Sequence, residues 1–277
     1  DNLILDDVGL AASEIMEFAR AGGSTLVDLT SRGPRINLDA LPQLAQSTGL
    51  NIIVGTGLYA PRFYPESLVS ERVDSLAEQF ARDVEEGIDG TRVRAGIIGR
   101  LCFEDVSDPR QDKVLRAGVR ASVRTGAPLA IDCPPGEVFD AVHRLLGEEH
   151  MPPTKVLLCG MDRDMAQDER KCAADRGYYL LFDGFGKEWW IRGGERRIPV
   201  DPERLRWLKE LIEAGCLRQL LISQGIDRKM LLVRYGGWGY AHIIRHILPM
   251  MANEKVAPKE ITTLTMHNPA RALAFLS

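Results

Sequence analysis

The sequence predicts an α/β protein: a single (β/α)8 barrel domain over residues 1–277, incomplete at its N-terminus. Three observations predict this fold. Short apolar or β-branched runs alternate with amphipathic stretches, as in a parallel sheet covered by helices. The 277 residues, 45% of them hydrophobic, can bury the large core of one barrel. A doubly wound open sheet is the alternative, but no GxGxxG motif follows the first predicted strand.

Seven runs have the composition of strands that are buried on both faces. They cover residues 24–30, 51–55, 93–98, 128–132, 155–159, 178–182 and 219–223. A closed barrel needs one more strand, so we expect an eighth strand upstream of Asp1.

Amphipathic stretches lie between the predicted strands and have the 3.6-residue period of helices. They include residues 8–21, 68–85, 111–124 and 202–214. Asp201-Pro202 is typical of a helix start, with Asp as the N-cap and Pro at the first helical position. Residues 103–108 and 186–200 are predicted to form long loops on the active face of the barrel.

Composition excludes several classes of partner. The net charge of −4 and the pI near 5.8 give no general attraction to nucleic acid or anionic membranes. The Arg-rich run at 192–197 is short and contains Glu195, which favours a solvated loop over a basic patch. No apolar stretch approaches the ~20 residues that span a bilayer.

The location of the protein is predicted from its N-terminus and its cysteines. Asp1, Asp6 and Asp7 stand where a signal peptide would carry basic residues. The five cysteines are scattered and form no CxxC pair, which favours free thiols in a reducing compartment. We therefore expect a cytoplasmic protein.

Six segments spread over the chain form a recognisable set. Residues 181–188 read Leu-Phe-Asp-Gly-Phe-Gly-Lys-Glu, 235–243 read Tyr-Gly-Gly-Trp-Gly-Tyr-Ala-His-Ile, and 267–271 read His-Asn-Pro-Ala-Arg. The other three cover residues 21–28, 48–59 and 96–99. Together they resemble the phosphotriesterase-related branch of the amidohydrolase superfamily. The resemblance implies a (β/α)8 barrel with its site at the mouth.

The resemblance also implies a metal centre in active members of the family. Two divalent ions, usually zinc, activate a water for hydrolysis there. The ligands are a His-x-His on strand one, a Lys or Glu after strand four, a His after each of strands five and six, and an Asp after strand eight. The matching positions here hold Arg100, Asp132, Gly160 and Gly225, and the His-x-His segment lies outside this chain. A guanidinium cannot ligate a cation, so we expect a degenerate centre and no metal cofactor.

Arg100 and Asp132 follow neighbouring predicted strands and are expected to meet at the mouth of the barrel. One interpretation is an ion pair that fills the vacated metal space. The other is a catalytic pair, in which Arg100 holds an anionic group of the substrate and Asp132 acts as a base. The further residues expected to bind substrate at the mouth are Arg32, Tyr59, Asp183, Asp227 and Trp238.

Structural roles are favoured for several polar side chains, including one of those placed at the mouth. Asp183 is expected to bond to Lys187 or Arg163 as part of the scaffold. His242 and His246 are four residues apart and share a helix face. A packed or partly exposed helix face is favoured over a zinc-binding pair, because the Glu of a His-Glu-x-x-His motif is missing.

Three functions are compatible with these observations. The favoured one is a non-hydrolytic barrel that binds a small-molecule ligand or a partner. The second is a metal-independent hydrolase of lactones or esters that uses Arg100 and Asp132. The third is a zinc-dependent hydrolase of esters, lactones or N-acyl amides, which requires ligands that the sequence does not contain.

The predicted open seam bears on the quaternary structure. Unpaired strand edges invite another chain, so we expect an upstream segment or an oligomer to cover them. Members of the family often form dimers, and we expect a homodimer. Trp189-Trp190, in the apolar loop 186–191, suits such an interface or a cap over the mouth.

Overall fold

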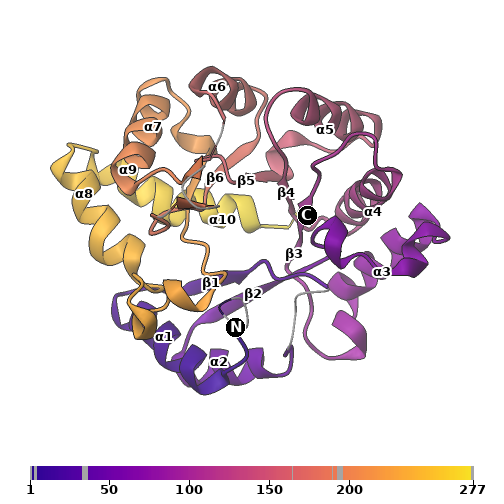
Figure 1. Ribbon diagram of the computed structural model, residues 1–277, viewed down its shortest axis with the longest axis horizontal. Coiled ribbons are helices and arrows are strands. Elements are labelled where there is room, and N and C mark those ends of the chain that lie inside the picture. Colours follow the sequence, from indigo (N-terminus) through magenta and orange to yellow (C-terminus); the bar gives the residue numbers. More distant parts are fainter. Residues whose placement is uncertain are drawn as a thin grey trace.

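The computed structural model describes residue 2 and residues 5–32, 37–163, 165–188, 190–191 and 196–275. Seven parallel strands form one curled sheet, and helices cover its outer side (Figure 1). Their order in the sheet is β1-β2-β3-β4-β5-β6-β9. The strands are β1 (Thr25–Asp28), β2 (Asn51–Thr56), β3 (Ile97–Cys102), β4 (Leu129–Asp132), β5 (Val156–Cys159), β6 (Tyr179–Phe182) and β9 (Leu220–Ile222).

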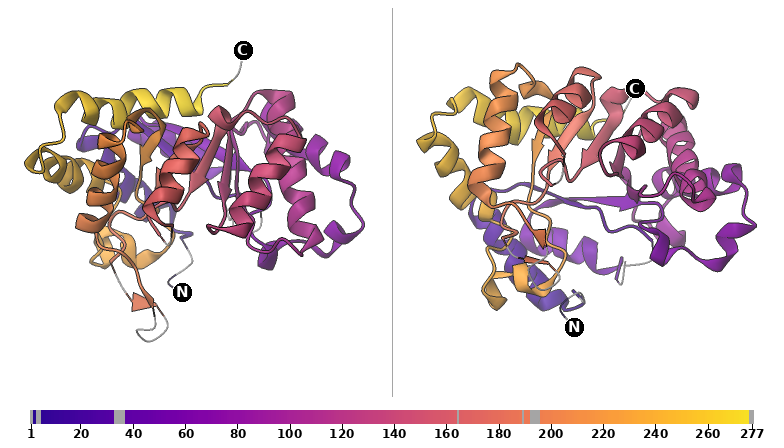
Figure 2. Two further views of the ribbon diagram at one scale, coloured as in Figure 1. Left: turned by 90° about the horizontal axis from the view of Figure 1, so that it is seen from above. Right: turned by 45° about the horizontal axis from the view of Figure 1, so that its top comes forward.

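Ten α-helices are present in the described residues. They are α1 (Val8–Arg20), α2 (Ala40–Thr48), α3 (Val73–Glu85), α4 (Pro109–Thr125), α5 (Glu137–Glu148), α6 (Gln167–Asp175), α7 (Asp201–Glu213), α8 (Leu248–Asn253), α9 (Pro258–Thr262) and α10 (Asn268–Leu273). Among these helices, none has the length and apolar character needed to cross a membrane. Figure 2 shows α10 along one end of the sheet, with the short antiparallel pair β7 (Trp190–Ile191) and β8 (Arg196–Arg197) projecting from the opposite end.

The strands bury both faces, as their continuous apolar composition predicts. Successive side chains alternate between the barrel interior and the layer beneath the helices. In β5, Leu157 and Cys159 belong to the inner cluster, whereas Val156 and Leu158 pack under the helices. The same alternation turns Asp132, the last residue of β4, to the inside. The fold thereby brings polar side chains at the strand ends together at the mouth.

The third described strand differs from its prediction. It was expected at residues 93–98, but β3 runs from Ile97 to Cys102. Arg100 reads as the end of a strand because a charge inside a buried strand is unusual. The structure accommodates it at a register shift against β4 between Ile98 and Leu101. A bulge of this kind re-aims a side chain, so Arg100 lies inside the strand and still reaches the mouth.

Two helix starts also differ. The segment predicted as a helix from residue 68 divides into a 3-10 turn at Glu66–Val69 and α3, which begins at Val73. Helix α7 begins at Asp201 itself, with Val200 as the N-cap residue, so Asp201 is not the cap. Its carboxylate serves a buried network, described below. Of the predicted loop 186–200, Trp189 and the side chain of Trp190 lie outside the described residues.

Candidate functional site

Arg100 lies at the centre of the barrel mouth, between two carboxylates. Its Nη1 donates to Oδ2 of Asp183 over 2.7 Å, and its Nε donates to Oδ2 of Asp132 over 2.8 Å. Its Nη2 also donates to that Asp132 oxygen. The three side chains are only 11–18% exposed, so water screens these ion pairs weakly. The structure thus brings Arg100 and Asp132 together and gives Asp183 a different partner, Arg100 in place of Lys187 or Arg163.

Both oxygens of Asp132 are engaged by cations. Arg163, in the loop after β5, donates from Nη2 to Oδ1, while Arg100 holds Oδ2. Burial alone raises the pKa of Asp132, but the charges of Arg100 and Arg163 outweigh it and the net shift is downward. Burial lowers the pKa of Arg100, yet the carboxylates of Asp183 and Asp132 raise it well above its usual value. Asp132 and Arg100 are therefore both ionised near neutral pH.

A third cation comes from the loop after β6. Lys187 donates from Nζ to Oδ2 of Asp227 over 3.1 Å. Burial raises the pKa of Asp227, but the positive charge of Lys187 and a hydrogen bond from Arg228 lower it overall. The backbone N–H of Gly225 donates to the carbonyl of Asp183 over 2.9 Å. This bond ties the loops after β6 and β9 together across the mouth.

Beneath these loops lies a second, fully buried ion-pair network. Arg204 of α7 donates from Nε to Asp162 over 2.8 Å and from Nη1 to Asp201 over 3.0 Å. All three side chains are at most 5% exposed. Burial raises the pKa of Asp162, and the nearby charge of Asp183 adds to this shift. The network anchors α7 to the loop after β5.

The same network holds the backbone of the loop after β6. The N–H of Gly184 donates to Asp162 over 2.7 Å, and the N–H of Gly186 donates to Asp201 over 2.9 Å. The other oxygen of Asp201 lies 2.6 Å from Nε2 of His242. Because backbone amides and a buried carboxylate fix both ends of this segment, Lys187 is presented to the mouth from a rigid turn.

His242 and His246 belong to a packed aromatic group. The ring of Trp238 lies 5.0 Å from each histidine ring, and the two histidine rings are 5.3 Å apart. His242 is buried, and its Nδ1 has no hydrogen-bond partner among the described residues. Trp238 is 49% exposed at the rim. His246 is exposed, so the pair forms the packed or partly exposed helix face favoured from the sequence.

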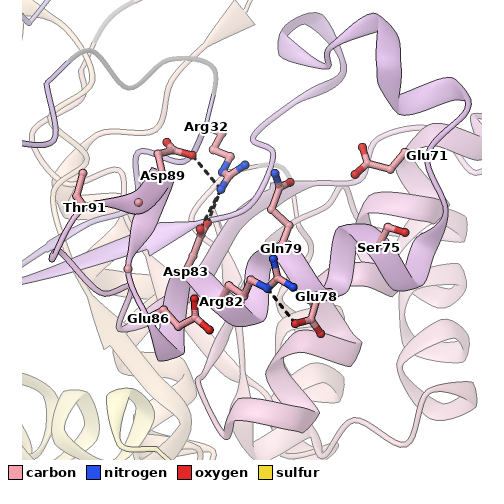
Figure 3. Close-up of a pocket in the computed structure, with 12 residues that line it drawn as sticks. Arg32, Glu71, Ser75, Glu78, Gln79, Arg82, Asp83, Glu86, Asp89 and Thr91 are labelled. Atoms are coloured by element: carbon pink, nitrogen blue, oxygen red, sulfur yellow. Dashed lines mark hydrogen bonds and ion pairs between the residues drawn. The ribbon is translucent and has the colours of Figure 1, made fainter.

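Arg32 does not join the group around Arg100. Its Nη2 lies 2.9 Å from Asp83 and 3.0 Å from Asp89, beside helix α3 (Figure 3). Burial raises the pKa of Asp83, which also accepts a hydrogen bond from Thr56. Arg32, Asp83 and Asp89 line a cavity of about 500 Å³ on the outside of the barrel. The structure therefore separates Arg32 from the other residues expected at the mouth.

Tyr59 lies close to the central ion pairs. Its carbonyl accepts a hydrogen bond from the N–H of Cys102, in β3, over 2.8 Å. Burial raises the pKa of Tyr59 to about 12, and the charges of Arg100 and Asp132 act on it in opposite directions. Tyr59 is therefore a neutral phenol beside the charged group.

The positions that the family resemblance assigns to metal ligands hold an arginine, a paired aspartate and two glycines. Arg100 places a cation between the carboxylates, and Gly160 and Gly225 have no donor side chain. Both oxygens of Asp132 already pair with guanidinium groups. Across the described residues, no group of three or more His, Cys, Asp or Glu side chains is arranged to hold a metal ion.

Sequence reasoning missed the parts played by Arg163, Arg204 and Asp201. Arg163 was treated only as a scaffold partner for Asp183, and Asp201 only as a helix cap. One available signal was the pairing of a glycine with a nearby cation: Arg163 follows Gly160 by three residues, and the loop between them is short enough to fold back. The buried Arg204 carries no such signal.

Comparison with known proteins agrees with this architecture. The sequence profile of the phosphotriesterase family matches residues 2–273. N-acetyltaurine hydrolase of Danio rerio is 32% identical over 282 residues, which cover 99% of this chain and 80% of that protein. The crystal structure of a resiniferatoxin-binding protein from Rhodobacter sphaeroides superposes with a TM-score of 0.94 at 32% identity, covering 98% of this chain and 76% of that one.

A lactonase from Listeria monocytogenes superposes with a TM-score of 0.89 at 25% identity, over 100% of this chain and 89% of that one. The curled parallel sheet is thus the barrel of these relatives, and its seven strands are consistent with a missing first strand. The chain belongs to the phosphotriesterase family of the amidohydrolase superfamily.

Proposed function

We propose that this chain is a phosphotriesterase-family barrel whose mouth does not carry the family's two-metal hydrolysis and instead binds a small-molecule ligand. One observation carries the proposal: the guanidinium of Arg100 lies between Asp132 and Asp183 and bonds to both. A metal ion at this place would have to displace a charge that two weakly hydrated carboxylates already hold.

The same geometry argues against Asp132 as a general base. A base must offer a free lone pair and a pKa near the working pH. Both oxygens of Asp132 are bound by cations, and its pKa is lowered. A carboxylate held in this way is a weak base near neutral pH.

The resiniferatoxin-binding relative supports a binding function, because at 32% identity it combines this barrel with a named small-molecule ligand. For the present chain the proposed ligand site is the mouth, with Tyr59 and the half-exposed Trp238 as its uncharged walls. The proposed partner is a small molecule, and a homodimer is the proposed assembly.

A hydrolase is the second candidate, and the names of the relatives favour it. One is an N-acetyltaurine hydrolase and another a lactonase, so N-acyl amides and lactones are the substrates to test. Metal-independent turnover would assign Arg100 to orient the substrate and Asp132 to activate water, after release of one of its ion pairs.

The test is a hydrolysis assay on the purified 277-residue chain with N-acetyltaurine and a lactone, each with and without added zinc. The proposal predicts no turnover above the buffer blank in either condition. Zinc-dependent turnover would overturn it. Turnover without zinc that disappears in an Asp132→Asn variant would establish the second candidate in its place.

A further inference from the structure

Two glycines at the mouth have cations in the space that a side chain would need. A Cβ built on Gly160 collides with the guanidinium of Arg163. A Cβ built on Gly225 lies 2.9 Å from Nζ of Lys187. Positions 160 and 225 are two of the family's ligand positions, so in this chain each ligand side chain is replaced by a glycine and a neighbouring cation.

The third ligand position carries its cation directly. Arg100 stands where the family has its bridging Lys or Glu, and its guanidinium lies between Asp132 and Asp183. At three positions that in relatives begin a metal-ligating side chain, a positive head group is found in this chain. Loss of the ligand side chains alone would not place positive charges at these three positions. The arrangement is therefore more than a loss of ligands.

We propose that Arg100, Arg163 and Lys187 form a side-chain cation centre that takes the place of the family's metal pair. This inference rests on the proposed function and names the side chains that account for it. The cation centre fills the space of the absent ligands and pairs with the carboxylates of the mouth.

The charges at the mouth balance through direct contacts. Arg100 neutralises Asp183 and shares Asp132 with Arg163, while Lys187 pairs with Asp227. Arg228 also contacts Asp227, so four cations face these three carboxylates. Among these described side chains, no excess negative charge is left to attract a divalent ion. The contacts of Arg100 are largely shielded from solvent, since its side chain and those of its two partners are 11–18% exposed. Arg163 and Asp227 are 43% and 49% exposed, so the outer contacts of the centre are partly open to solvent.

Chemical rescue tests the proposal. An Arg100→Ala variant leaves a guanidinium-sized space between Asp132 and Asp183. Free guanidinium should bind there in place of the Arg100 side chain and form the same hydrogen bonds. We expect the substitution to lower Tm by roughly 6 °C or more, because it removes the counter-charge of Asp183 and leaves Asp132 with Arg163 alone.

Millimolar guanidinium chloride should then raise the Tm of Arg100→Ala above its value in sodium chloride of equal ionic strength. The parent chain and an Arg206→Ala control, whose side chain is 64% exposed, should show no such rise. The proposal would be overturned if guanidinium chloride did not raise the Tm of Arg100→Ala above its value in sodium chloride. It would also be overturned if the Tm of the control rose by as much.

A second measurement applies if Arg100→Ala does not fold. Gly160→Ala is compared in the parent and in an Arg163→Ala background. The strain of the positive φ at Gly160 is common to both, so it cancels in the difference. The centre predicts a smaller drop in Tm when Arg163 is already absent, whereas equal drops would contradict it. Failure here leaves the proposed function standing, while zinc-dependent hydrolysis by the parent would remove the proposed function itself.

Discussion

The guanidinium of Arg100 reaches two carboxylates from inside a strand, where charged side chains are rare. Its partners on β4 and after β6 are themselves fixed by the sheet register, in which Asp132 lies beside Cys159 and Cys159 beside Leu181. The pairing therefore depends on backbone that cannot shift easily. An exchange of Arg100 for a neutral residue removes the counter-charge of Asp183 and one of the two that Asp132 has.

Asp132→Asn tests the electrostatic part of this account at the level of one residue. The charges of Arg100 and Arg163 outweigh burial and lower the pKa of Asp132. Its ionised form therefore stabilises the fold above the unfolded pKa of about 3.9, and this contribution is lost as the pH falls through the lower folded pKa. We expect Asp132→Asn to lower the free energy of unfolding by roughly 3 kcal/mol at pH 7.

The measurement is urea unfolding between pH 3 and pH 8, with the exposed Asp6→Asn as the control. The difference between the parent and Asp132→Asn should stay constant above about pH 5 and shrink below about pH 4. A difference that grows on acidification would contradict the lowered pKa.

At the residue scale, the sequence predicted only part of the site. Arg100 and Asp132 were expected to meet because neighbouring parallel strands end at the same edge. The partner of Asp183 was predicted wrongly, since the contact depends on the length and direction of the Arg100 side chain. Arg32 was expected at the mouth from its place after β1, but its side chain turns outward to Asp83.

Helix α7 is the element that connects the two charged layers of the mouth. Its first residue, Asp201, and its fourth, Arg204, face inward one helical turn apart. Arg204 donates to Asp162, which accepts a hydrogen bond from the N–H of Gly184, and Asp201 accepts one from the N–H of Gly186 in the same loop after β6. The start of the helix therefore sets the position of the loop that carries Lys187.

Arg204→Met tests this connection. The substitution leaves Asp162 and Asp201 buried without their cation, so we expect a loss of about 3–5 kcal/mol in the free energy of unfolding. Faster hydrogen exchange at the amides of Gly184 and Gly186 should accompany it, because their acceptors become mobile. Arg206→Met on the same helix, with a side chain 64% exposed, is the matched control and should stay within about 0.5 kcal/mol of the parent. Unchanged hydrogen exchange at both glycines would show that α7 does not hold the loop after β6, and would contradict this connection.

At the element scale, strand existence was predictable and strand boundaries were less so. Apolar runs located all seven strands of the main sheet, because parallel strands buried on both faces have a composition that surface elements lack. The bounds of β3 differ from the prediction by several residues because of its bulge, and the hydrophobic pattern of the sequence does not indicate this bulge. The start of α7 was placed one residue late, since Asp201 resembles a cap while its carboxylate is used elsewhere.

On the scale of the whole molecule, β1 and β9 are the two outermost strands of the sheet in the described part of the chain. Val27 of β1 is 36% exposed, which is unusual for the strand of a barrel. Exposed strand edges favour association with another chain. We therefore expect the 277-residue chain, of 30.8 kDa, to run as a homodimer. Light scattering coupled to size-exclusion chromatography measures this, and a stable monomer would contradict it.

The whole sequence predicted the fold better than it predicted the chemistry. The alternation of strands and helices, together with the family's motifs, predicted the barrel, which the family profile and the solved relatives confirm. The chemistry depends on where a few long charged side chains end. Arg163, Lys187 and Arg204 each have several reachable partners, and only packing selects among them.

The zinc content of the purified chain, after incubation with excess zinc and desalting, tests the central claim most directly. The account predicts close to no zinc per chain, because Arg100, Arg163 and Lys187 already hold the carboxylates of the mouth. One or two zinc ions retained per chain would show that the mouth binds metal despite these cations, and would contradict the account.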